Sequence, residues 1–471
     1  MSGKTDGVTR RSFLKTAGST MAIASAATQV GNLSAQETGR KTRLAIVGTG
    51  SRGTGMWGSP VVRDYADRVQ FVGLCDINKK RALVAQRLLG RGVTDQDGHL
   101  SDAGGQTVDA TEIPVFTDFD EMIRVTNPER VIVTTMDSTH AQYVIRAMEL
   151  GCDVICEKPF ATDEEQCQAI IDAQKKYGRQ VTVTFNARYG ASTTKVKELL
   201  NAGEIGDLYS VDYAEYLDDD HGTSYFRRWH GIKENSGTLL VHKASHHFDQ
   251  LNWWIGSDPT DISALGELRR FGRKGPFRHA NCRLCTQKAE CPSYWDITKS
   301  KNLVQMYVEC ESEDGYYRDG CVYRTGVNIY DAMSVQVKYA NKVLVTYSLN
   351  VGAPCEGQFI VFNGSKGRIE LRNYDRQPFE APAVAEIRLM KNGHKDSQLI
   401  PIERRSGSHG GSDRLIRDHV FIPNSPDPMK HKAGSRAGIM SSIIGIAAYR
   451  SIERKVPVQV KDLIDISGFE A

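Results

Sequence analysis

The chain has 471 residues, of which 40 % are apolar and 25 % are charged, values that are ordinary for a soluble protein. Its 60 Lys and Arg residues against 57 Asp and Glu residues give a formal charge of +3, so charge gives no reason to expect nucleic acid or an anionic membrane as a partner. A chain of this length suggests two or three domains with large cores.

The first 39 residues are expected to be a twin-arginine export signal. Residues 9–15 read T-R-R-S-F-L-K, and a mildly apolar stretch rich in Ala, Ser and Thr follows at 16–30. This stretch is too short and too mild for a stable membrane helix, so no lasting membrane anchor is predicted. The alternative is a disordered basic tail. The signal predicts passage through the twin-arginine export machinery and a periplasmic or otherwise exported location.

A dinucleotide-binding turn is predicted directly after this signal. An apolar run at 44–47 is typical of a buried strand, and it leads into G-T-G-S-R-G at 48–53. Gly48 permits a tight turn, Gly50 lets the backbone approach a pyrophosphate, and Gly53 lets the next helix pack on the strand. The phosphates would face N–H groups at the start of that helix. The predicted cofactor-binding residues here are Gly48, Gly50, Ser51, Arg52 and Gly53.

Asp76 follows the second predicted strand, at 69–74. A carboxylate at this place can accept both hydrogen bonds of an adenosine ribose, and it disfavours a 2′-phosphate. NAD is therefore the predicted cofactor. NADP stays open, because Arg52 and the basic run at 79–81 could bind the extra phosphate.

The order of strand-like and helical segments changes after the first domain. From 40 to 162, strand-like and helical segments alternate, which predicts an α/β, Rossmann-type doubly wound parallel sheet. From 163 to 471, strand-like stretches cluster, and V-Q-V-K-Y at 335–339 alternates as in a strand with one buried face. We expect a second, α+β domain with a large, mostly antiparallel sheet for substrate binding and oligomerisation. A cysteine-rich insertion at about 269–324 interrupts it.

Six further motifs follow the glycine turn. They are T-x4-H at 135–140, E-K-P at 157–159, F-N-A-R-Y at 185–189, G-x4-H-x3-H-x2-D at 237–249, N-G-S-K-G at 363–367 and H-G-G-S-D at 409–413. Their order resembles the Gfo/Idh/MocA oxidoreductases, which include glucose–fructose oxidoreductase and inositol dehydrogenases. The resemblance covers nearly the whole chain after the signal. It implies an NAD(P)-dependent enzyme with a carbohydrate substrate, and we expect a homodimer or homotetramer.

Three residues are candidates for catalysis. Lys158, in E-K-P, follows the last predicted strand of the first domain, at the sheet edge where ligands bind in open α/β folds. The resemblance implies that it hydrogen-bonds the reacting hydroxyl of the substrate and stabilises the developing alkoxide. His246 is the predicted general base, because imidazole titrates near neutral pH. His242 is four residues earlier, so on one helix both rings would share a face. It stands where the family more often has Asp.

Plainer alternatives exist for each of these residues. Lys158 could be a surface residue that pairs with Glu157. The two histidines have a metal-binding spacing, although the K-A-S between them has no Glu to act as a base. Both could also be core residues whose nitrogens are satisfied by the backbone.

Further residues are assigned to the cofactor or the substrate. The resemblance places Asn186 beside the nicotinamide, and the other candidates for cofactor binding are Asp137, His140, Glu157 and Lys158. Aromatic rings next to guanidinium groups suit a sugar ring and its hydroxyls. The predicted substrate residues are Arg188, Tyr189, Tyr216, Arg228 and His230. Arg188 could instead be part of an ion pair, and the cluster at 216–230 could be a chance mixture. H-G-G-S-D at 409–413 could close the pocket or support a subunit contact.

The cysteines form two groups. Those in or beside the first domain, Cys75, Cys152, Cys156 and Cys167, are expected to be buried thiols. In the insertion, Cys282, Cys285 and Cys291 form C-x2-C-x5-C, which predicts a structural zinc completed by one more thiolate or nitrogen. Disulfides, an iron–sulfur cluster and free thiols are the alternatives.

These features together predict an exported oxidoreductase. It would transfer hydride between a sugar, glycoside or polyol hydroxyl and a tightly held nicotinamide cofactor. One alternative is a glycoside hydrolase or lyase that oxidises the sugar transiently and then eliminates. The other is a sugar-binding sensor that retains NAD without turnover.

Overall fold

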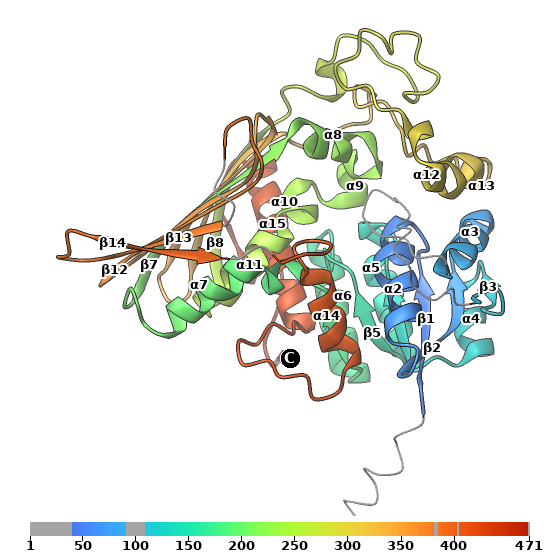
Figure 1. Ribbon diagram of the computed structural model, residues 1–471, viewed down its shortest axis with the longest axis horizontal. Helices are drawn as coiled ribbons and strands as arrows, with labels where there is room; N and C mark the ends of the chain where they lie inside the picture. Colours follow the sequence, from blue (N-terminus) through green and yellow to red (C-terminus); the bar gives the residue numbers. More distant parts are fainter. Residues whose placement is uncertain (1–39, 91–108, 381–384, 403–404, 470–471) are drawn as a thin grey trace, which may run out of the picture. The chain divides into compact units, whose positions relative to one another are not determined.

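The computed structural model describes residues 40–90, 109–380, 385–402 and 405–469 (Figure 1). The predicted export signal at 1–39 lies outside the described residues. The described residues from Arg43 onward form one compact unit, which contains both sheets and the candidate site. Within the described residues, no helix has the length and apolar character needed to span a membrane.

The first sheet has six parallel strands in the order β3-β2-β1-β4-β5-β6, which is typical of a dinucleotide-binding fold. Its strands are β1 (Thr42–Val47), β2 (Val69–Cys75), β3 (Val115–Phe116), β4 (Arg130–Val133), β5 (Asp153–Cys156) and β6 (Val181–Val183). The strands are apolar and buried, as expected where helices cover both faces. The predicted doubly wound sheet is confirmed. It continues past residue 162, because the helix after E-K-P returns the chain to a sixth parallel strand.

Three helices of this domain begin at side-chain caps. Asn78, Asp118 and Asp163 each accept a hydrogen bond from a backbone N–H of the first turn, which satisfies a donor that the helix cannot pair itself. The helices are α2 (Ser59–Asp64), α3 (Lys79–Leu89), α4 (Phe119–Thr126), α5 (His140–Glu149) and α6 (Glu164–Tyr177). Before α2, the glycine turn opens into a buried π-helical segment, Gly53–Gly58.

The second sheet has nine strands in the order β14-β13-β12-β11-β7-β10-β9-β8-β15. Its neighbours pair antiparallel except β10 and β7, so the predicted mostly antiparallel sheet is confirmed. In β9 buried and exposed residues alternate as expected. The strands are β7 (Leu208–Asp218), β8 (Pro259–Glu267), β9 (Ala332–Tyr339), β10 (Leu344–Ala353), β11 (Glu356–Gly364), β12 (Gly367–Arg376), β13 (Ala385–Lys391), β14 (Ser397–Ile402) and β15 (Val458–Gln459).

Helices pack on one face of this sheet and carry the candidate site. The long α15 (Ser435–Arg454) lies against β8 and against α11 (Ser245–Ile255), as Figure 1 shows. Further helices after β6 are α7 (Ala191–Asn201), α8 (Asp219–Arg227), α9 (Lys233–Ser236), α10 (Leu239–His242) and α14 (Ser412–Phe421), and Ile416 and Phe421 of α14 pack in an apolar cluster of the first domain.

The insertion connects β8 to β9 and reaches back to the first domain. Its two short helices, α12 (Lys301–Met306) and α13 (Glu311–Asp314), lie next to α3 in Figure 1. Val84 and Leu88 of α3 form a separate apolar cluster with Ile297, Leu303, Met306, Tyr307 and Cys310 of the insertion. The insertion is therefore packed against the dinucleotide domain.

Candidate active site

The glycine turn has the geometry of a phosphate cradle. Gly48 has a φ of +88°, and a Cβ there would lie 2.6 Å from the backbone of Thr134. A Cβ on Gly53 would lie 2.2 Å from the carbonyl oxygen of Gly48, so the helix can approach the strand only through a glycine. A Cβ on Gly50 would have only the Tyr307 hydroxyl within 4 Å, at 3.2 Å. These residues fit a dinucleotide-binding turn, because Gly48 and Gly53 allow the close approaches that such a turn needs, while the Tyr307 hydroxyl faces Gly50.

Asp76 stands at the end of β2, held in place by protein donors. Its Oδ2 accepts hydrogen bonds from the N–H and hydroxyl of Thr49 at 2.8 and 3.0 Å. Its Oδ1 accepts from the N–H of Asn78 at 2.9 Å and lies 3.4 Å from Arg81. A carboxylate has about four acceptor positions. These four donors use about all of these positions and fix Asp76 beside the turn.

Lys158, Asp137 and His242 meet in a buried cluster at the carboxyl edge of the first sheet. Lys158 follows β5, joined to Pro159 by a cis peptide bond, and its Nζ donates to the carbonyl oxygen of His242 at 3.1 Å. Nδ1 of His242 lies 2.5 Å from Oδ2 of Asp137. Burial lowers the pKa of Lys158 to about 8, although Asp137 and Glu157 act to raise it. An ammonium with this pKa readily exchanges a proton near neutral pH.

His246 lies next to this cluster with an unpaired ring nitrogen. Its Nδ1 is buried and has no hydrogen-bond partner among the described residues. Burial and then the charge of Lys158 lower the pKa of His246 well below 6.5, so the ring is neutral at neutral pH. Its ring packs edge-on against Phe185, with 6.3 Å between the centroids.

The spacing of His242 and His246 predicts that both lie on one helix. In the structure they lie on two. His242 ends α10, a turn at Lys243 and Ala244 follows, and His246 is the second residue of α11. The chain is already broken at Thr238, which has a φ of +75°. Because of the turn at Lys243 and Ala244, His242 faces Asp137 and His246 faces Phe185. The described residues contain no metal-binding group that includes both rings.

Arg52 links the glycine turn to the E-K-P motif and to the second domain. Its Nε donates to Oε1 of Glu157 at 2.8 Å, and Trp57 donates to the same oxygen at 2.8 Å. Asp413, the last residue of H-G-G-S-D, lies 3.7 Å from Arg52 and accepts from Asn186 Nδ2 at 2.7 Å. Arg52 and His409 hold the pKa of Asp413 below its usual range, against the effect of burial.

Asp413 was not assigned a role from the sequence, although its motif was noted. The sequence alone does not show that residues more than 200 positions apart meet in one site. In the structure it joins two predicted cofactor residues, Arg52 and Asn186. Motif 409–413 therefore supports the cofactor side of the site.

An aromatic and cationic wall stands beside His242. His230 stacks on Trp229 with 3.6 Å between the ring centroids and meets His242 edge-on at 4.1 Å. The guanidinium of Arg228 lies 5.0 Å from the ring centroid of Tyr225, and burial lowers its pKa to about 10. The structure thus brings the predicted substrate residues Arg228 and His230 to the catalytic cluster.

Three predicted substrate residues lie elsewhere. Arg188 is buried in a two-bond ion pair with Asp249, both bonds 2.6 Å, which is the plainer alternative. Tyr189 is buried and stacks on His431, with 5.0 Å between the centroids. Tyr216 is next to the buried Glu215 on β7, and the alternation of a strand turns it to the opposite face of the sheet.

His140 lies between the loop that carries Lys158 and the loop after β4. Nδ1 of its ring lies 2.7 Å from the carbonyl oxygen of Pro159, and Nε2 lies 3.2 Å from that of Thr135. Burial lowers the pKa of His140, so the neutral ring has one N–H and can donate to only one of these two carbonyl oxygens. The assignment of His140 to the cofactor stays a prediction. The ring positions the loop that carries Lys158.

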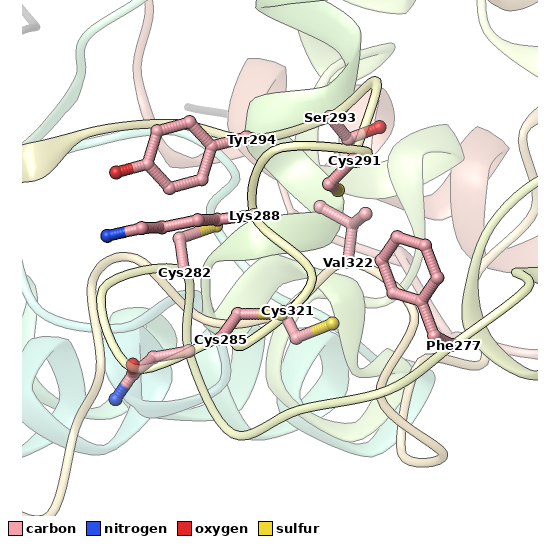
Figure 2. Close-up of a pocket in the computed structure, with 10 residues that line it drawn as sticks. Phe277, Cys282, Cys285, Lys288, Cys291, Ser293, Tyr294, Cys321 and Val322 are labelled. Atoms are coloured by element: carbon pink, nitrogen blue, oxygen red, sulfur yellow. The ribbon is translucent and has the colours of Figure 1, made fainter.

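Four cysteines of the insertion lie around one pocket. Cys282, Cys285, Cys291 and Cys321 line this small pocket, with Phe277 and Val322 on its wall (Figure 2). Among the described residues, no three His, Cys, Asp or Glu side chains are placed to hold a metal. The zinc predicted from C-x2-C-x5-C is therefore not supported within the described residues. All ten cysteines are free thiols, and the four of the first domain are buried, as predicted.

Comparison with known families covers both domains. Residues 42–185 match the model for the "Oxidoreductase family, NAD-binding Rossmann fold", and residues 197–460 match the "Oxidoreductase family, C-terminal alpha/beta domain". YteT of Bacillus subtilis (strain 168), a protein named as an oxidoreductase, is 31 % identical to this chain over 448 residues, which cover 90 % of this chain and 99 % of YteT. Inositol 2-dehydrogenase 3 of Saccharopolyspora erythraea is 35 % identical over 289 residues, 60 % of this chain and 75 % of that protein.

Solved structures share the fold. The WlbA dehydrogenase from Bordetella pertussis, in complex with NADH and UDP-GlcNAcA, has a TM-score of 0.57 at 18 % identity and covers 89 % of this chain and 99 % of its own. An aldose-aldose oxidoreductase from Caulobacter crescentus, complexed with glycerol, has a TM-score of 0.56 at 16 % identity, with coverage of 89 % and 100 %. With both domains matched, the chain belongs to the Gfo/Idh/MocA family of NAD-binding oxidoreductases.

Proposed function

We propose that the protein oxidises a hydroxyl of a sugar, glycoside or polyol by transferring hydride to a tightly held NAD. The observation that carries the proposal is the meeting of Lys158, with its lowered pKa, and His246, with its unpaired nitrogen, beside the glycine turn. The wall of Trp229, His230 and Arg228 offers ring faces and donors of the kind that bind sugars. Its relatives include an inositol dehydrogenase.

In this proposal, Lys158 and His246 divide the proton chemistry. Lys158 donates a hydrogen bond to the reacting oxygen and stabilises the negative charge that develops there as the C–H bond breaks. His246 accepts the hydroxyl proton. Nicotinamide supplies the hydride acceptor when it is bound. Asp137 holds the tautomer of His242, whose carbonyl oxygen positions Lys158.

NAD is proposed over NADP because of the charges around Arg81. Its guanidinium lies 3.4 Å from Asp76 and 2.6 Å from Asp314. Both carboxylates occupy donors that a 2′-phosphate would need. Arg81 therefore supports a ribose with free hydroxyls, as Asp76 does.

Oxidation should slow as the pH rises above about 8. The pKa of Lys158 is lowered to about 8, so the ammonium is present below this pH and is lost above it. Because the charge stabilises the alkoxide, kcat/KM should fall about tenfold per pH unit on the alkaline side. His246 is neutral throughout this range. A pH profile of kcat/KM measures the pH at which this decline begins. A decline that begins only near 10.5, the ordinary pKa of lysine, would contradict the role of Lys158.

The choice of His246 as the base can be tested against His242. His246→Asn should lower kcat about a hundredfold or more without weakening dinucleotide binding, because a proton acceptor is lost. His242→Asn should lower kcat less, because an amide can still donate to Asp137. Steady-state kinetics of both variants give the comparison. A larger loss in His242→Asn would identify His242, held by Asp137, as the base.

A glycoside hydrolase or lyase remains the alternative, because oxidation acidifies a neighbouring C–H and permits elimination. An aryl glycoside distinguishes the two chemistries. Release of the aryl alcohol without net NADH would favour elimination, and net NADH from a free sugar or polyol would favour the dehydrogenase. A sensor without turnover would do neither. The paired acid and base at Lys158 and His246 count against a sensor, since binding alone needs neither.

Export and self-association remain proposals as well. Twin-arginine export rests on T-R-R-S-F-L-K at 9–15, and it suits a protein that folds around a cofactor before it leaves the cytoplasm. A homodimer or homotetramer is expected alongside it.

A further inference from the structure

A tyrosine of the insertion is hydrogen-bonded to the glycine turn. The hydroxyl of Tyr307, just after α12, accepts a hydrogen bond from the backbone N–H of Ser51 at 2.9 Å. It also lies 2.9 Å from the Ser51 hydroxyl, and it is the atom nearest to the open side of Gly50. Tyr307 is buried.

This N–H is a group that a dinucleotide fold presents to phosphate. In a G-x-G-x-x-G turn, the backbone after the second glycine and the start of the helix receive the pyrophosphate. Ser51 is the residue after Gly50. The hydroxyl of Tyr307 therefore occupies a phosphate-facing amide, and a phosphate oxygen and Tyr307 cannot both be the acceptor in that position.

Other contacts hold the same segment on α3. Asp314 pairs with Arg81 at 2.6 Å, and Asn78 donates to the carbonyl oxygen of Cys310 at 2.9 Å. Beneath them lies the apolar cluster that Val84 and Leu88 form with the insertion. These contacts do not involve the phosphate-facing amide, so they can persist when a dinucleotide is bound.

We propose that residues 297–314 are a latch over the dinucleotide site, held shut by Tyr307 when the site is empty. The proposal rests on the dinucleotide site of the proposed function. NAD enters only when the Tyr307–Ser51 contacts break. The contacts of the segment with α3 then keep the latch over the bound cofactor, which slows its release. The insertion thereby gives the chain a means of retaining its cofactor between turnovers.

Binding of NADH to cofactor-stripped full-length protein tests the latch. Stopped-flow fluorescence gives association and dissociation rates without any sugar present. Tyr307→Phe keeps the ring but loses both contacts with Ser51, so association should be about tenfold faster with little change in dissociation. Tyr317→Phe, on an exposed tyrosine of the same insertion, is the matched control and should leave both rates unchanged. Asp314→Asn, which weakens the hold on α3, should speed dissociation.

Each other outcome has a defined meaning. Unchanged association in Tyr307→Phe would overturn the latch, and so would weaker binding, which would make Tyr307 a ligand of the cofactor. If NADH binds to neither wild type nor variant, the dinucleotide site fails together with the latch. If NADH binds but no sugar is oxidised, only the proposed reaction fails.

Discussion

Lys158→Ala should abolish turnover and leave the dinucleotide bound. Lys158 is the one ammonium that the structure places between the carboxyl edge of the first sheet and His242, within the described residues. Loss of a partly buried charge aimed at a developing alkoxide should lower kcat on the order of a thousandfold. The glycine turn and Asp76 are untouched, so NADH affinity should stay near that of wild type.

Two measurements make this prediction specific to Lys158. Steady-state kinetics give kcat, and NADH fluorescence gives the affinity of the same preparation. Lys195→Ala, on the surface of α7, is the control for loss of a lysine and should be nearly silent. Turnover within tenfold of wild type in Lys158→Ala would show that another group stabilises the alkoxide.

Gly48→Ala should prevent dinucleotide binding and destabilise the first domain. The new Cβ would lie 2.6 Å from the backbone of Thr134, and the residue must also keep a φ of +88°. Strain and overpacking together should lower the free energy of unfolding by about 3 kcal/mol. Any relief moves the turn away from β4, so the phosphate-facing amides lose their positions.

Gly178→Ala separates the clash from the backbone strain. Gly178 ends α6 with a φ of +61°, and a Cβ there would have nothing within 4 Å. We expect a loss of about 1 kcal/mol and normal NADH binding. Denaturant unfolding and NADH titration of both variants give the comparison. Equal losses would show that positive φ, and not the close approach to Thr134, requires glycine at position 48.

The sequence predicts the first domain well because its signals are local. Apolar runs, glycines at fixed spacing and an acid after the second strand lie within 35 residues, and each has a direct physical meaning. The alternation in β9 likewise predicted a half-buried strand correctly. The family followed from the order of its motifs, and both halves of the chain match it.

The parts that sequence reasoning did not predict depend on tertiary contacts. The i,i+4 spacing of His242 and His246 implies one helix, but the break after α10 turns them to different partners. Asp413 and Tyr307 reach the cofactor side from distant segments, and no local pattern marks them. Cysteine spacing does not fix how the side chains are oriented: Cys282, Cys285 and Cys291 line one pocket, but no metal-binding group is found among the described residues.

The identity of the nucleotide carried by the purified protein tests the central claim most directly. The protein should be recovered gently from the compartment in which it works, denatured, and its released small molecules identified by mass spectrometry. We predict NAD or NADH in an amount approaching one per chain. Protein that carries no nicotinamide nucleotide, and that takes up none when it is offered, would contradict the claim.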